Sequence, residues 1–134
     1  MKVLSLKQPW AMLVAMGVKR IETRSWATKY RGPLLIHASQ RVDKLVCKKE
    51  PFCKYIKAEG LPVGAIIASC RLIDCVLIDE NFRNKVMAMG DEFYFGDYSI
   101  GRYAWILDDM KMLDKPVPAK GQLGLWGHKF EEGI

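Results

Sequence analysis

Hydrophobic and polar residues near the start of the chain follow first a helical period and then a strand period. Trp10, Leu13 and Val14 recur on one face of a helix. Pro9 suits the first helical position, and Gly17 is the kind of residue that ends a helix in the left-handed conformation. The pattern therefore predicts a short helix that ends at Gly17.

The residues after this glycine alternate as they do in a β-strand. The alternation places Arg20, Glu22 and Arg24 on one face and Ile21 and Thr23 on the other. Two cations that flank a carboxylate are not the composition of an ordinary core strand. This strand face is therefore a candidate functional surface.

Several later segments have the β-branched and apolar composition of strands. The longest of them exceeds the usual strand length, so we expect a bend or bulge near Arg71. A turn at Tyr98–Gly101 is expected to lead into the strand that follows. The predicted strands are Gly32–Ala38, Gly64–Ile78, Tyr103–Leu107 and one or two strands within Val117–Trp126.

Two further helices are predicted between these strands. The first begins near Val42 and is broken or kinked at Pro51, after which an apolar face continues to Gly60. The second is capped by Asp79 and closed by Gly90. Several strands with intervening short helices indicate an α+β fold in a single domain that spans residues 1–134.

Composition agrees with one globular domain. The chain has 134 residues, half of them hydrophobic, which is enough for one core. A charged fraction of 27% and a mean hydropathy of -0.03 exclude a disordered chain and a membrane protein. Gln8 and Pro9 interrupt the apolar start before it reaches the length of a signal-peptide core. We therefore expect a cytoplasmic protein without membrane association.

The four cysteines favour reduced, buried thiols over disulfides or a metal site. Cys70 and Cys75 lie in an apolar strand pattern, and nothing else in the sequence indicates secretion. There is no Cys-x-x-Cys pair, and the two histidines are far apart. His37 lies in an apolar run and is expected to be a satisfied core or rim histidine. The sequence predicts neither a metal nor a cofactor.

A formal net charge of +6 and a pI near 9.2 indicate a polyanionic partner. The first third of the chain holds many cations and few acids, whereas a later group is interpreted as an ordinary solvated helix face. The first group is Lys7, Lys19, Arg20, Arg24, Lys29 and Arg31. The second is Arg41, Lys44, Lys48, Lys49, Lys54 and Lys57.

Two tryptophans, Trp10 and Trp26, bracket the charged strand. A surface ion pair between Glu22 and Arg24 would contribute little by itself. Apolar surface beside charge is, however, the usual composition of a ligand site. The tryptophans are therefore expected at the rim or floor of a cavity.

The pattern Gly17-x-Lys19-x-x-Glu22-x-Arg24, preceded by Ser5-Leu6-x-x-Pro9-Trp10, resembles the signature of the ASCH domain, a module related to the PUA superfamily. Further motifs are similar to the activating-signal-cointegrator-1 branch of that family and to its stand-alone prokaryotic members. The similarity covers about residues 2–126. The further motifs are Arg20, Ser25-Trp26, Arg31-Gly32, Pro33-Leu34-Leu35-Ile36, Gly101-Arg102-Tyr103-Ala104-Trp105 and Lys120-Gly121-Gln122-x-Gly124-Leu125-Trp126.

The resemblance implies a closed, PUA-like β-barrel of about five to six strands surrounded by short helices. It also implies binding of RNA, or of DNA, in a basic cleft lined by the signature motif. Arginine and lysine would hold a phosphate or a base edge, and tryptophan would stack on a base. The expected nucleic-acid-binding residues are Lys7, Trp10, Lys19, Arg20, Glu22, Arg24, Trp26, Arg31 and Lys120.

Some relatives of this family are enzymes, and two of their activities bear on this chain. A metal-independent ribonuclease or nucleoside hydrolase would use Lys19, Glu22 and Arg24. In the ribonuclease, Glu22 would act as the base, Lys19 as the acid and Arg24 as the stabiliser of the phosphate. The same three residues would serve a binding site equally well. In the relatives that hydrolyse acylated cytidine, a threonine stands where this chain has Glu22, so that activity is not predicted.

A protein-interaction module in a transcription or translation assembly is the third hypothesis, with protein partners in RNA-related assemblies. An exposed patch around Phe93, Tyr94, Phe95 and Tyr98 would then be the docking surface. The simpler interpretation, which we favour, is that these aromatic residues fold back over the end of the barrel.

Overall fold

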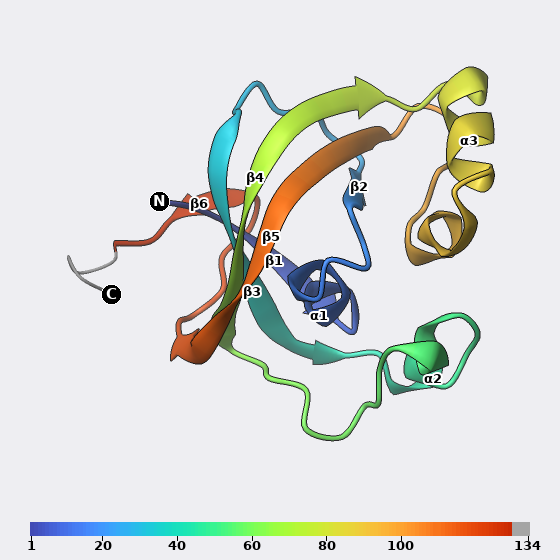
Figure 1. The fold of residues 1–134 in the computed structure, drawn as a ribbon. Coiled ribbons are helices and arrows are strands. Elements are labelled where there is room, and N and C mark those ends of the chain that lie inside the picture. Colours follow the sequence, from blue (N-terminus) through green and yellow to red (C-terminus); the bar gives the residue numbers. More distant parts are fainter. Residues whose placement is uncertain (130–134) are drawn as a thin grey trace.

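The computed structural model describes residues 1–129 of the chain and shows an α+β fold (Figure 1). Its main elements are β1 (Lys2–Gln8), α1 (Trp10–Ala15), β2 (Ile21–Arg24), β3 (Gly32–Val42), α2 (Lys44–Cys47), β4 (Ala65–Leu77), α3 (Glu80–Met87), β5 (Tyr103–Pro118) and β6 (Leu125–Gly127). Two 3-10 helices, η1 (Phe52–Lys54) and η2 (Gly90–Phe95), complete it.

The strands of the described residues form one mixed sheet with the order β2-β5-β4-β3-β1-β6. β1 and β3 are parallel, and the other neighbours are antiparallel. The long strands β4 and β5 run side by side and curve strongly, so that the sheet wraps around its concave face (Figure 1). The α+β class and the six strands are confirmed. The closed barrel is not, because β2 and β6 remain the two open ends of the hydrogen-bonded sheet.

The main core lies on the concave side of this sheet. Alternate residues of the strands point inward, among them Leu4, Ile36 and Trp105, which are at most 1% exposed. Helix α1 lies against the same side (Figure 1) and adds Ala11 and Val14. Burial of a large apolar side chain stabilises a fold by about 1.5–3 kcal/mol, so these positions hold α1 in place.

The predicted helix boundaries are partly confirmed. Asp79 caps α3, since its Oδ1 accepts a hydrogen bond from Phe82 N at 2.8 Å. Gly17 and Gly90 have φ angles of 76° and 77°, the left-handed conformation that favours glycine. The expected helix before Pro51 is only the four-residue α2, and η1 follows the proline.

Two strands are longer than the sequence pattern predicts, and another was not predicted. β5 continues past the expected end at Leu107 to Pro118, so Val117 belongs to β5, and in the described residues only the three-residue β6 follows it. β1 was not expected, because Val3–Leu6 is a short apolar run that Gln8 and Pro9 follow at once. β3 extends beyond Ala38 to Val42, so that Arg41 lies in a strand. The bend expected near Arg71 is confirmed, because the pairing of β4 with β5 shifts register on both sides of it.

The cysteines and His37 have different environments. All four cysteines are free, but Cys53 is exposed, so the expectation of buried thiols is wrong there. Burial raises the pKa of Cys70 to about 12. His37 is 1% exposed, and both of its ring nitrogens have partners, as expected of a satisfied histidine.

Within residues 1–129, no helix is long and apolar enough to cross a membrane, and no cluster of metal-ligating side chains is found.

Candidate functional site

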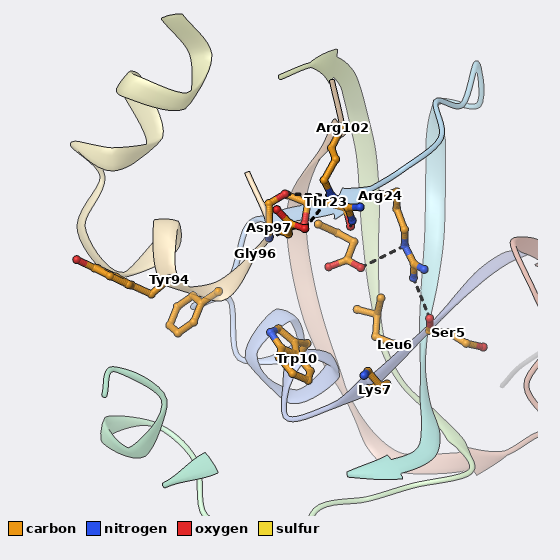
Figure 2. A pocket seen from close by; sticks show the side chains of 12 residues that line it. Ser5, Leu6, Lys7, Trp10, Thr23, Arg24, Tyr94, Gly96, Asp97 and Arg102 are labelled. Carbon is orange, nitrogen blue, oxygen red and sulfur yellow. Dashed lines mark hydrogen bonds and ion pairs between the residues drawn. The ribbon is translucent and has the colours of Figure 1, made fainter. Parts of the chain in front are cut away.

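A cavity of about 500 Å³ lies between β1 and β2, two strands that do not pair with each other in the sheet (Figure 2). In the described structure, β6 pairs with Lys2–Leu4, and from Ser5 onward this edge of β1 has no strand partner. The cavity lies along that edge and is also bordered by α1 and η2. Its lining consists of Ser5, Leu6, Lys7, Trp10, Glu22, Thr23, Arg24, Tyr94, Phe95, Gly96, Asp97 and Arg102.

Arg24 bridges the gap between the two strands. Its Nη2 donates a hydrogen bond to Ser5 O at 3.0 Å, and its Nε lies 3.2 Å from Glu22 Oε2 (Figure 2). The Nε group is not aligned for a hydrogen bond, so its contact with Glu22 is an ion pair. The side chain is 26% exposed. The guanidinium group is thus fixed by two partners and still accessible from the cavity.

Glu22 lies between two cations. Its Oε1 is 3.3 Å from Lys19 Nζ, while its Oε2 faces Arg24. The carboxylate is 12% exposed and lines the cavity. An anion held between two cations orients both of them, and here only Arg24 also reaches the cavity.

Lys19 lies behind the cavity wall. Its side chain is fully buried, and its Nζ donates a hydrogen bond to Ile21 O and pairs with Glu22. The sequence interpretation assigned Lys19 to nucleic-acid contact or to acid catalysis. In the structure, Lys19 has no exposed surface from which to contact a ligand. The turn after α1 holds it there, since the backbone N–H of Lys19 donates a hydrogen bond to Leu13 O.

A second carboxylate, that of Glu92 in η2, is buried beside the start of β2. Its Oε1 accepts a hydrogen bond from Arg20 N at 2.7 Å, and its Oε2 has no hydrogen-bond partner within the described chain. Burial raises the pKa of Glu92, and the charge of Lys19 opposes that rise. Burial and the charges of Glu92 and Glu22 raise the pKa of the nearby Tyr98. These groups form a buried polar layer that supports β2.

A second ion pair lies beside β2, where Arg102 Nε is 3.6 Å from Asp97 Oδ2 (Figure 2). Arg102 Nη2 donates to Thr23 O at 3.3 Å, and its Nε donates to Asp97 O at 3.2 Å. Hydrogen bonds from the Ser99 hydroxyl and backbone N–H lower the pKa of Asp97, and Arg102 adds to this effect. Arg102, the residue before β5, therefore links the loop at Asp97 to β2 and presents a second guanidinium group to the cavity.

Aromatic side chains border the mouth of the cavity. Trp10 is half-buried, with Lys7 Nζ 5.7 Å from its ring centroid. Tyr94 is 64% exposed, which leaves its ring available to a ligand. Phe95 is buried, as expected if the aromatic run folds back over the domain. Cations beside accessible aromatic faces suit an anionic ligand with flat rings.

The predicted site residues fall into several groups. Lys7, Trp10, Glu22 and Arg24 line the cavity, and Lys120 lines a different one. Arg20 precedes β2 and pairs with Asp108 at 3.0 Å on the surface. Three further residues also lie outside the lining: Lys19 is buried as described above, Trp26 packs edge-on against Trp105, and Arg31 pairs with Asp74.

Sequence reasoning missed much of the cavity wall. Tyr94, Asp97 and Arg102 are far from the motif in the chain. The pairing of β2 with β5 brings Arg102 to it, and the packing of η2 against α1 brings Tyr94. Arg102 stands in one of the late motifs that resembled the family. That motif was the available signal, but it gave no indication of which strand lies beside it.

The sequence matches the model of the ASCH domain over residues 4–116. The chain belongs to the ASCH family. It is 29% identical to activating signal cointegrator 1 of Homo sapiens and 28% identical to that of Mus musculus, with 92% of this chain covered in each case. This ASCH chain spans about a fifth of those relatives, 21% of their length.

A solved structure of an ASCH protein from Zymomonas mobilis has a similar fold. The TM-score is 0.57 at 18% sequence identity, over 87% of this chain and 72% of that one. At this identity, the likeness concerns the fold alone. The match supports the α+β, PUA-like architecture expected from the sequence.

Proposed function

We propose that this ASCH domain binds RNA in the cavity between β1, β2 and η2. The observation that carries the proposal is the position of Arg24, which two partners hold in a fixed orientation while it faces the cavity. A guanidinium group fixed before the ligand arrives loses little conformational entropy on binding. PUA-like domains generally bind RNA, which agrees with this chemistry.

Each wall of the cavity would take a different part of a nucleotide. Arg24 and Arg102 suit a phosphate or the acceptor edge of a base. Trp10 and Tyr94 suit stacking on a base. The cavity volume lies in the range of about 300–1,000 Å³ that is usual for small-ligand sites, so one nucleotide fits better than a duplex.

The placement of Lys19 favours binding over cleavage. The ribonuclease scheme needs Lys19 to protonate a leaving oxygen, which requires a hydrogen bond to the substrate. Its Nζ is instead enclosed between Ile21 O and Glu22. We infer that Glu22 orients Arg24 rather than acting as a base.

Protein partners are a separate proposal that rests on the name of the curated relatives, which describes a cointegrator of activating signals. The aromatic run offers such a partner little surface, because Phe95 and Tyr98 are at most 3% exposed. Tyr94 is exposed, but it borders the cavity. RNA is therefore the partner that this surface suits best.

Labelled single-stranded RNA incubated with the protein and a chelator tests the proposal. We expect bound, intact RNA, with log affinity falling against log salt at roughly -0.7 for each phosphate bound. The same titration with DNA of equal sequence shows whether the 2′-hydroxyl contributes. A flat salt response, or chelator-resistant cleavage that Glu22→Gln abolishes, would contradict the proposal.

A further inference from the structure

A second cavity, of about 890 Å³, lies on the other side of β1 and has no role in the proposal above. It is bounded by the end of β3, by Gly64 before β4 and by the loop between β5 and β6. Its lining consists of Ser5, His37, Ser39, Gln40, Arg41, Gly64, Pro118, Ala119, Lys120, Gly121, Gln122 and Leu123.

The inner wall of this second cavity is polar and well ordered by hydrogen bonds. His37 Nε2 lies 2.7 Å from Ala119 O, and a carbonyl only accepts, so Nε2 carries the proton. In the neutral ring, Nδ1 then accepts the hydroxyl proton of Ser5, whose Oγ is 3.0 Å away. Trp126 Nε1 donates to the same hydroxyl at 3.1 Å. The loop between β5 and β6 is thereby held against β3.

Close approach of the backbone shapes the same wall. A Cβ added at Gly121 would lie 2.8 Å from His37 Cε1, and one added at Gly64 would lie 2.3 Å from Gln40 Nε2. Distances this short require movement of the neighbour. Glycine at these two positions lets the loop and the start of β4 lie directly against β3.

The two cavities are connected through shared residues. Ser5 lines both of them. A shallower hollow of about 550 Å³ adjoins both cavities, since it shares Lys7 with the first lining and Arg41 with the second. The cause is an irregularity in strand pairing: Leu6 pairs with Ala38 but Gln8 pairs with Val42, so three residues of β3 stand opposite Lys7. This bulge places Arg41 beside the end of β1.

The charges along this route are mostly positive. The hollow and the second cavity together contain Lys7, Arg41, Lys44 and Lys120. The carboxylate in these two linings is that of Asp43, which is engaged in capping α2 through Val46 N at 3.1 Å. A row of exposed cations, in which the one carboxylate is already hydrogen-bonded to a backbone N–H, attracts a polyanion.

We propose that one RNA strand, with a nucleotide in the first cavity, continues over Lys7 and Arg41 into the second cavity, where Lys120 binds its backbone. This inference rests on the proposed function, because it extends the same ligand. Single-strand binders combine such a basic groove with stacking side chains. The route assigns a ligand role to Arg41, which the sequence interpretation placed on a solvated helix face.

Oligonucleotides of two lengths test this path. The affinities of a uridine trinucleotide and a uridine dodecanucleotide are measured for the wild type, for Arg41→Ala/Lys120→Ala and for the matched pair Lys48→Ala/Lys49→Ala. All four side chains are exposed, so circular dichroism should show an unchanged fold. We expect Arg41→Ala/Lys120→Ala to weaken dodecanucleotide binding about tenfold, because each of the two exposed cations contributes up to about 1 kcal/mol. For this double variant, the slope of log affinity against log salt concentration should become shallower by roughly 0.7 for each phosphate that is no longer bound.

The outcomes separate this path from the first cavity. Equal losses of affinity in the two double variants, or a loss as large for the trinucleotide as for the dodecanucleotide, would overturn the path. If Arg24→Ala weakens binding at both lengths while Arg41→Ala/Lys120→Ala has no effect, the path is wrong and the proposed function stands. If the wild type binds neither oligonucleotide, both proposals are wrong.

Discussion

Lys19 and Arg24 belong to one short motif, carry the same charge and share one carboxylate, yet their environments differ completely. Lys19 Nζ lies 3.3 Å from Glu22 Oε1 with its side chain fully buried. Arg24 Nε lies 3.2 Å from Glu22 Oε2 with 26% of its side chain exposed. The first cation faces the buried polar layer with Glu92, and the second faces the cavity.

This difference divides the motif into a structural part and a ligand-binding part. Glu22 is the boundary, because its two oxygens face in the two directions. Removing one partner of a buried ion pair strongly destabilises the fold, because the other partner is left as an unpaired buried charge. Removing a partly exposed guanidinium group destabilises the fold less, and such a group is available to a ligand.

Removal of the Lys19 charge should have the largest effect. In Lys19→Met the side chain keeps most of its length, but Glu22 and Glu92 lose their buried cation. We expect the free energy of unfolding to fall by about 3–5 kcal/mol, as when one partner of a buried pair is removed. Urea denaturation measures it. The exposed control Lys48→Met should stay within about 0.5 kcal/mol of the wild type, and an equal result for Lys19→Met would contradict the structural role.

Arg24→Ala should show the opposite profile. We expect RNA affinity to fall by about 1.5–3 kcal/mol, the contribution of a hydrogen bond to a charged group. The free energy of unfolding should change by about 1 kcal/mol or less, because a partly exposed ion pair contributes little. Fluorescence anisotropy and urea denaturation of the same preparation measure both. A large loss of stability with unchanged affinity would reverse the comparison.

Tyr94→Ala tests whether the cavity mouth takes a base. Stacking of a base on an aromatic side chain contributes about 1–3 kcal/mol by alanine substitution. We expect a loss at the lower end of that range, because the ring is largely exposed. Ile100→Ala removes an exposed apolar side chain outside the cavity lining and serves as the control. The stacking role is wrong if the two variants bind RNA equally well.

The pH dependence of stability tests the buried layer and should be the smallest effect. Burial raises the pKa of Glu92 above its ordinary value of 4.5. Between the two pKa values, the folded state keeps a proton that the unfolded chain has released. This group's contribution to stability therefore falls as pH rises from 4.5 through the folded-state pKa. Over that pH window, the free energy of unfolding of the wild type should fall relative to that of Glu92→Gln. If the difference between the two proteins does not change with pH, the pKa of Glu92 is not raised.

The sequence predicted local features of the structure better than it predicted how distant segments pack together. The cap at Asp79, the turn at Gly17 and the alternation of Ile21 with Glu22 follow from neighbouring residues, and the structure shows all three. β1 was missed because its apolar run is short. The family resemblance correctly implied the fold class.

The burial of Lys19 was not predictable, because its charge favours solvent unless distant groups compensate it. Those groups include Glu92, which lies far along the chain. Trp26 was expected at the cavity and instead packs against Trp105. Arg41 was placed on a helix because no local signal marks the bulge in β3. In each case, the missing information was a long-range contact.

Chemical modification of the wild-type protein tests the division of the motif most directly. The folded protein, with and without saturating single-stranded RNA, is treated with an arginine-specific dicarbonyl and a lysine-specific acylating reagent, and each site is quantified by mass spectrometry. We predict that Arg24 reacts in the free protein and is protected by RNA, whereas Lys19 is unreactive in both states. Modification of Lys19 in the free protein with protection by RNA, or equal modification of Arg24 in both states, would contradict the account.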